Sequence, residues 1–141
     1  MTPRVVLDTC VLVAGLRSHR GASHRLLRQV GIGYFEHVVS VPLVIEYEAA
    51  LRRPETVVRL AHGAVDDVLD FLCLTGVRQD IHFAWRPALP DPGDDFVLEV
   101  AVNGQCDAIV TFNLRDFVGA GRFGVAVLTP QQFLTRLEGD R

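Results

Sequence analysis

Features that would indicate a membrane, secreted or zinc-binding protein are absent from this sequence of 141 residues. No apolar run reaches the roughly 18 residues that a membrane-spanning helix needs. The short apolar segment after Pro3 ends at Asp8, which is too short for the hydrophobic part of a secretory leader. The 3 cysteines are widely spaced and contain no CxxC pair, so they indicate neither a zinc site nor a redox motif. We therefore expect a cytoplasmic protein without membrane contact.

The sequence also has no excess of positive charge. Its net charge is −3, and all 14 basic residues are arginine. A negative net charge argues at first against a nucleic-acid partner, because phosphate contacts need positive charge. An enzyme that collects carboxylates around a metal ion is an exception, since the ion neutralises them locally.

Predicted strands and helices alternate along the whole chain. Short β-branched runs predict strands at 4–7, 38–41, 108–111 and 125–128, with an edge strand at 77–83. Apolar spacings of three and four predict helices at about 11–16, 23–31, 42–51, 55–63, 64–75, 94–103 and 130–137, and a helical turn at 114–117. The alternation predicts a three-layer α/β/α fold around a mostly parallel sheet of about four or five strands. No linker or repeat interrupts it, so we expect residues 1–141 to form a single domain.

Acidic and amide side chains follow the predicted strands. Asp8 comes directly after the first strand, and Asn113 and Asp116 come after the strand at 108–111. Glu46 lies on the helix after the second strand, and Asp94 begins the helix at 94–103. The carboxyl ends of parallel strands form the ligand-binding edge of an open sheet, so these side chains are expected to converge. Clustered carboxylates need a cation or a shared proton, and Mg²⁺ and Mn²⁺ prefer oxygen ligands.

Each of these residues also has an ordinary structural explanation. Asp94 could cap its helix, as aspartate often does, and Glu46 and Asp116 could lie on solvated helix faces. Asp8 is the hardest to explain in this way, because a carboxylate that ends a buried strand needs a partner. The joint pattern, rather than any one residue, favours a metal site.

Four blocks of the sequence, in order, resemble the PIN domain (PilT N-terminus) family. They are VVLDTCVL at 5–12, SVPLVIEY at 40–47, DPGDDFVLEVA at 91–101 and DAIVTFN at 107–113. The third block, together with LRRP at 51–54, is similar to a subgroup identified with the VapC-like toxins of type II toxin–antitoxin pairs. The resemblance covers nearly the whole chain and implies a PIN-like fold.

The resemblance also implies an activity. A PIN-domain toxin is a Mg²⁺- or Mn²⁺-dependent endoribonuclease that hydrolyses RNA phosphodiester bonds, commonly forms homodimers, and is blocked by a small antitoxin protein. The resemblance implies that Asp8, Glu46 and Asp94 are the catalytic metal ligands, and that Asn113 or Asp116 completes the set. We expect Thr9, Ser40 and Thr111 to support these ligands.

Two departures from the family pattern leave an alternative open. Cys10 stands where relatives have asparagine, and Asn113 stands where many have a fourth aspartate. Both favour a PIN-fold protein that binds RNA or a partner with weak or lost catalysis. A phosphatase of the haloacid dehalogenase kind is a more distant alternative, because that family needs a second aspartate at the position of Cys10.

One dense basic cluster is a candidate substrate contact. Arg17, Arg20 and Arg25 lie at the end of the first predicted helix and on the second. Arginine suits phosphate, so these three are expected RNA-binding residues, with a solvated helix face as the alternative.

Overall fold

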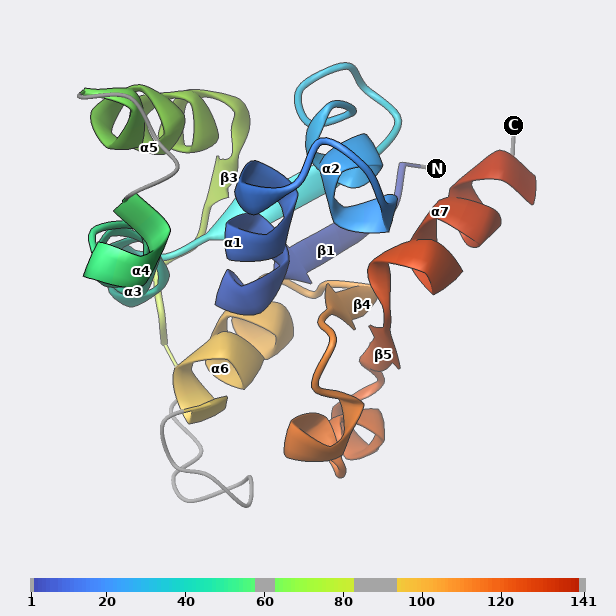
Figure 1. Cartoon of the computed structure of the whole chain (residues 1–141). Coiled ribbons are helices and arrows are strands. Elements are labelled where there is room, and N and C mark those ends of the chain that lie inside the picture. The colour runs from blue at the N-terminus through green and yellow to red at the C-terminus, as the bar shows by residue number, and fades with distance from the viewer. Residues whose placement is uncertain (1, 58–62, 83–93, 140–141) are drawn as a thin grey trace.

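A five-stranded sheet forms the centre of the computed structural model, which describes residues 2–57, 63–82 and 94–139 (Figure 1). The strand order is β3-β2-β1-β4-β5, and every neighbouring pair is parallel. The strands are β1 (Arg4–Leu7), β2 (Glu36–Val39), β3 (Val77–Arg78), β4 (Ala108–Val110) and β5 (Ala126–Leu128). The predicted parallel sheet of four or five strands is confirmed.

Helices connect these strands and cover both faces of the sheet. The described α-helices are α1 (Thr9–Arg17), α2 (Ala22–Leu27), α3 (Val41–Leu51), α4 (Pro54–Val57), α5 (Ala64–Thr75), α6 (Asp95–Asn103) and α7 (Pro130–Gly139). Two 3₁₀ helices, η2 (Leu114–Phe117) and η3 (Ala120–Phe123), lie between β4 and β5. None of the helices in the described ranges is long and apolar enough to cross a membrane.

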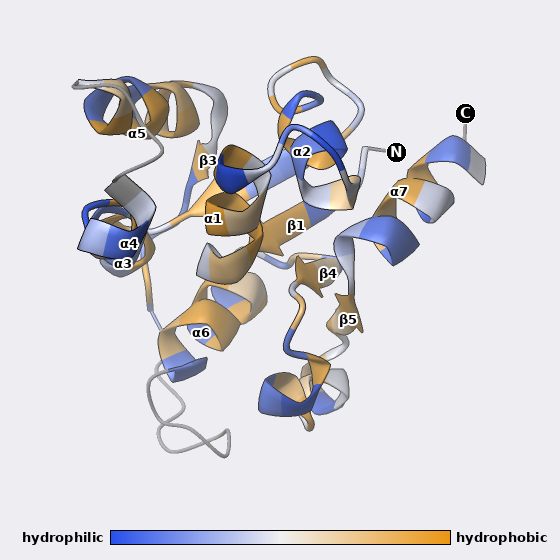
Figure 2. Cartoon of the chain, viewed as in Figure 1, coloured by the Kyte–Doolittle hydropathy of each residue, from blue (hydrophilic) through white to orange (hydrophobic). Residues whose placement is uncertain are grey.

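The core has two parts because side chains alternate across a strand. Val6 packs in one cluster with buried residues of α3, α5 and α6. Val5 and Leu7 pack in the other cluster with residues of α2 and α7. Figure 1 shows α6 and α7 on opposite sides of β4, and Figure 2 shows the hydrophobic strands between them. The predicted three-layer α/β/α fold is confirmed.

The register of the sheet positions the functional edge. Val5 pairs with Ala108 and Leu7 with Val110, so β1 and β4 end level with each other. The backbone N–H of Asp8 still donates to the carbonyl of Val110, at 2.9 Å. Asp8 therefore leaves the sheet beside the end of β4.

Several boundaries differ from those predicted. The strand predicted at 38–41 is Glu36–Val39, because Ser40 caps the next helix by accepting a hydrogen bond from Leu43 N at 3.2 Å. The helix predicted at 23–31 is Ala22–Leu27, with Gly21 rather than Ser23 at its N-cap. After Leu27 the chain tightens into turns, in which residues 29 and 30 bond to carbonyls three positions back.

The predicted edge strand at 77–83 is also shorter, at Val77–Arg78. In the described part of the chain it pairs with β2, which ends at Val39 where the chain enters α3, so residues 80–82 have no strand to pair with there. Of the helix predicted at 55–63, the structure describes α4 (Pro54–Val57). Residues 58–62 and 83 lie outside the described residues.

Candidate active site

Asp8 is the centre of the candidate site and is fixed by three polar neighbours. It directly follows β1 and is the N-cap of α1, where its Oδ1 accepts a hydrogen bond from Thr9 N at 2.9 Å. Its Oδ2 accepts one from the Thr111 hydroxyl at 2.7 Å, and the Cys10 thiol lies 3.5 Å from the same oxygen. The residue is 8% exposed. These contacts supply the partner that a buried carboxylate needs.

Thr111 connects Asp8 to the loop after β4. It is fully buried, and its hydroxyl accepts a hydrogen bond from Asn113 N at 2.9 Å while donating to Asp8. These two consecutive hydrogen bonds, from Asn113 N to Thr111 and from Thr111 to Asp8, therefore fix the ends of the neighbouring strands β1 and β4 relative to each other. Of the residues expected to support the site, Thr111 thus contacts Asp8 through its side chain and Thr9 through its backbone N–H.

We expect Thr111→Val to reduce the activity of the site without unfolding the protein. Valine fills nearly the same volume but removes the hydrogen bonds to Asp8 Oδ2 and from Asn113 N. If Asp8 is a metal ligand, as the sequence predicts, loss of a contact that orients it should cost about 10- to 100-fold. Thr111→Ser, which keeps the hydroxyl, is the matched control. Metal-dependent RNA cleavage rates check this, and a valine variant as active as wild type would show that the contact does not matter.

Tyr47 joins the helix that carries Glu46 to the strand that carries Asp8. Its side chain is 1% exposed, and its hydroxyl donates a hydrogen bond to the carbonyl oxygen of Leu7. Burial, and then the nearby charge of Asp8, raises the pKa of the Tyr47 hydroxyl, so it stays a donor. Tyr47 was given no role from the sequence. Its place beside Glu46 in the second block was the only signal of this role.

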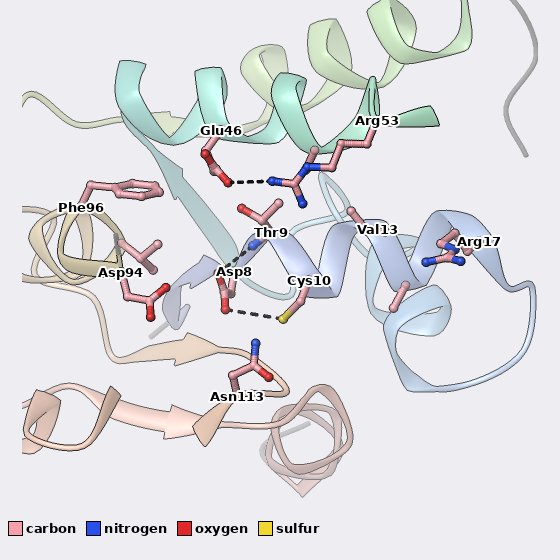
Figure 3. Close-up of a pocket in the computed structure, with 13 residues that line it drawn as sticks. Asp8, Thr9, Cys10, Val13, Arg17, Glu46, Arg53, Asp94, Phe96 and Asn113 are labelled. Carbon is pink, nitrogen blue, oxygen red and sulfur yellow. Dashed lines mark hydrogen bonds and ion pairs between the residues drawn. The ribbon is translucent and has the colours of Figure 1, made fainter. Parts of the chain in front are cut away.

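Asp8 opens onto a pocket of about 430 Å³ at the carboxyl edge of the sheet. Figure 3 shows side chains from α1, α3, the start of α6 and the loop after β4 around it. Its described lining is Asp8, Thr9, Cys10, Val13, Ala14, Arg17, Glu46, Ala50, Arg53, Asp94, Phe96, Val97 and Asn113. Four predicted ligands from separate parts of the chain, Asp8, Glu46, Asp94 and Asn113, thus share one pocket.

Glu46 and Asp94 enter the pocket from two different helices. Glu46, on α3, forms an ion pair with Arg53, in which Glu46 Oε1 and Arg53 Nη2 are 3.8 Å apart. Asp94 holds the N-cap position of α6, but in the described structure its side chain makes no capping hydrogen bond to that helix. Its carboxylate points toward Asp8 in Figure 3. The structure therefore does not support the ordinary explanation of Asp94 as a capping residue.

Arg53 was given no role from the sequence, although it lines the pocket. It lies two residues beyond the end of α3, so helical spacing from Glu46 does not place it. No local signal in the sequence marked it as a pocket residue.

Other predicted residues lie elsewhere. The described lining of the pocket does not include Asp116, which sits in η2. Ser40 caps α3 and lines a separate pocket beside β2. Arg17 lines the candidate site, whereas Arg25 donates to Gln131 on α7 at 2.8 Å. Arg20 is exposed and is not part of the described lining.

Cys10 takes part in the polar contacts around Asp8. Its Sγ lies 3.5 Å from Asp8 Oδ2 and 3.6 Å from the Thr111 hydroxyl. Burial, and then the charge of Asp8, raises the pKa of the Cys10 thiol, so the sulfur stays protonated and donates weakly. The thiol thus stands where the family pattern has asparagine. It is a smaller group and a weaker hydrogen-bond donor than the asparagine amide.

The donor atoms of the pocket suit a hard divalent cation. They are carboxylate oxygens of Asp8, Glu46 and Asp94 and the amide oxygen of Asn113, the ligands that Mg²⁺ and Mn²⁺ prefer. Within residues 2–57, 63–82 and 94–139, no three histidine, cysteine, aspartate or glutamate side chains could hold a metal ion together. Mg²⁺ does not require such a cluster, because it commonly binds through one or two carboxylates and keeps several waters. The residues therefore fit a hydrated ion.

Comparison with known proteins agrees with this geometry. The family model described as PIN domain matches residues 4–115, a range that includes every acidic residue and the amide that line the pocket. No curated protein matches the chain. PIN domains are typically nucleases that act on RNA, and they generally bind divalent metals. Because the match covers most of the sequence and starts at the strand that delivers Asp8, the chain belongs to the PIN-domain family.

Proposed function

We propose that this protein is a Mg²⁺- or Mn²⁺-dependent endoribonuclease that hydrolyses RNA phosphodiester bonds. The observation that carries the proposal is the environment of Asp8. Its carboxylate is held by Thr9 N and the Thr111 hydroxyl and faces a pocket that it shares with Glu46 and Asp94. Three carboxylates around one open pocket repel each other unless a cation is present.

The residues divide the task as follows. One or two of the carboxylates of Asp8, Asp94 and Glu46 would bind the metal directly, and the others would bind it through the waters that it keeps. Asn113 would add a neutral oxygen, and its place in the pocket favours it over Asp116. When bound, a divalent ion activates a water molecule and stabilises charge on the phosphate during an in-line displacement. The backbone N–H of Thr9 and the hydroxyl of Thr111 keep Asp8 in one orientation, which avoids reorganisation during the reaction.

Cleavage of a labelled pool of structured RNA by the purified protein tests the proposal. The assay is run with Mg²⁺, with Mn²⁺ or with chelator, beside Asp94→Asn and the control Asp70→Asn, an exposed aspartate of α5. We expect cleavage with metal that is lost in chelator and in Asp94→Asn but kept in Asp70→Asn. Wild-type protein that stays inactive in both metals, at high concentration and free of partner, would contradict the proposal.

A second candidate function is RNA or partner binding with weak catalysis. The two residues that depart from the family pattern favour it. Cys10 gives Asp8 a weaker hydrogen-bond donor than asparagine would, and Asn113 brings no charge to the pocket. This function predicts weak or absent Mg²⁺ binding together with RNA binding that persists in chelator.

We further propose that the nuclease is the toxin of a toxin–antitoxin pair. The blocks at 51–54 and 91–101 support this, although residues 91–93 lie outside the described residues. Residues 1–141 would then act as one domain in the cytoplasm, form a homodimer, and be blocked by a small antitoxin. Growth arrest on expression, relieved in Asp8→Asn, tests the toxin role.

A further inference from the structure

Arg53 is the basic residue of the pocket that contacts a predicted metal ligand. It follows α3 by two residues, and its Nη2 lies 3.8 Å from Glu46 Oε1. Figure 3 shows its guanidinium group reaching over the pocket toward Glu46. Arg17, the other arginine of the described lining, lies at the opposite end of α1 from Asp8.

The contact between Arg53 and Glu46 is a loose one. A separation of 3.8 Å is beyond hydrogen-bonding distance, and the two side chains are 57% and 38% exposed. Exposed pairs of this kind contribute little to stability. The neighbouring Arg52, in contrast, donates to Glu48 at 3.1 Å and also pairs with Asp66. Arg52 is therefore held in place, whereas Arg53 is free to exchange its partner at low cost.

A metal ion and Arg53 would compete for the same carboxylate. The charge of Glu46 is shared when both bind it, so a divalent ion that enters the pocket weakens the ion pair between Glu46 and the guanidinium group of Arg53. Arginine presents a planar set of N–H donors that matches phosphate oxygens in a bidentate arrangement. An RNA phosphate bound at the metal would bring such oxygens into the pocket that Arg53 already lines.

We propose that Arg53 pairs with Glu46 while the pocket lacks a metal ion, and that it contacts an RNA phosphate once a metal has bound. The inference rests on the proposed function and adds a substrate contact to it. Arg53 thus has two opposite effects: it weakens metal binding and strengthens RNA binding.

The test measures both effects on Arg53→Gln, with Arg52→Gln as the matched control. Both variants remove one positive charge from adjacent positions, so a difference between them reports the contact rather than the net charge. Mn²⁺ binding is measured by isothermal titration calorimetry. Binding of a fluorescein-labelled single-stranded RNA is measured by anisotropy, in Ca²⁺ and in chelator, and the RNA is checked on a gel for integrity.

We expect Arg53→Gln to bind Mn²⁺ about two- to fivefold more tightly than Arg52→Gln, as loss of a competing exposed ion pair predicts. In Ca²⁺ it should bind the RNA roughly tenfold more weakly. The salt dependence of that binding should fall by about 0.7 in log–log slope, which corresponds to one phosphate contact. In chelator the effect on RNA binding should be small, and Arg53→Lys should recover part of the binding seen in Ca²⁺.

Unchanged or weaker Mn²⁺ affinity in Arg53→Gln would overturn the competition, and unchanged RNA affinity in Ca²⁺ would overturn the phosphate contact. Failure of the proposed function looks different. If wild-type protein itself binds no Mn²⁺, the metal site and this inference fall together, whereas equal Mn²⁺ affinities in all variants would overturn the inference alone.

Discussion

Asp8→Asn should lower the rate of metal-dependent RNA cleavage by about 1,000-fold or more, which corresponds to about 4 kcal/mol of transition-state stabilisation. The change keeps the size of the side chain, and the one amide oxygen can accept from either Thr9 N or the Thr111 hydroxyl. It removes the charge of the carboxylate that directly follows β1. Single-turnover cleavage in Mg²⁺ measures the loss.

The same substitution should not unfold the protein. Asp8 shares its pocket with Glu46 and Asp94, so a neutral residue relieves repulsion in the metal-free state. We expect the free energy of unfolding in chelator to stay within about 1 kcal/mol of wild type or to rise. Mn²⁺ should stabilise wild type but not the variant, because binding to the folded state alone raises stability.

Asp116→Asn is the control for this prediction. Asp116 lies three residues after Asn113 but outside the described lining of the pocket. The Asp116→Asn variant should therefore retain nearly full activity. An equal loss in Asp8→Asn and Asp116→Asn would show that the pocket is not the reaction site.

Acid should destabilise the protein through His37, by about 2 to 3 kcal/mol between pH 7 and pH 4.5. His37 lies on β2 and is 2% exposed. Its Nε2 is 3.1 Å from the Thr75 hydroxyl, and Nδ1 has no hydrogen-bond partner in the described part of the chain. Burial lowers the pKa of His37 from 6.5 to about 4.

The sign of the effect follows from proton binding. The unfolded chain takes up a proton at His37 below about pH 6.5, whereas the folded chain resists this until its own pKa of about 4. The stabilisation is therefore present above pH 6.5 and is lost as the pH falls toward 4. Urea unfolding of wild type and His37→Gln at several pH values isolates this residue from the carboxylates. Parallel profiles for the two proteins would contradict the prediction.

The parts of the fold that were predictable follow short-range patterns. The strand Arg4–Leu7, the helix Ala64–Thr75 and the turn at Leu114–Phe117 match their predicted ranges, because apolar periodicity and glycine breaks are local signals. The strand at Glu36–Val39 was placed two residues late. The β-branched run through Val41 continues past the point where the Ser40 hydroxyl begins a helix.

In the candidate site, too, some features were predictable from the sequence and others were not. The sequence placed Asp8, Glu46, Asp94 and Asn113 at one edge because strand ends in a parallel sheet coincide, and these four line one pocket. Contacts between elements were not predictable. The hydrogen bond from Tyr47 to Leu7 joins residues that are 40 positions apart, and no local pattern encodes it. Asp116 was a candidate because it follows the strand at 108–111 on a predicted helical turn, and that position does not say toward which element the side chain points.

The central claim, that the acidic pocket hydrolyses RNA with a metal-activated water, is tested most directly by the chemistry of the product ends. Mass spectrometry of short RNA products made in Mg²⁺ or Mn²⁺ identifies those ends. The account predicts linear phosphate ends with no 2′,3′-cyclic phosphate, and no products in chelator, because water rather than the ribose 2′-hydroxyl attacks the phosphorus. Cyclic phosphate ends, or cleavage that continues in chelator, would contradict it.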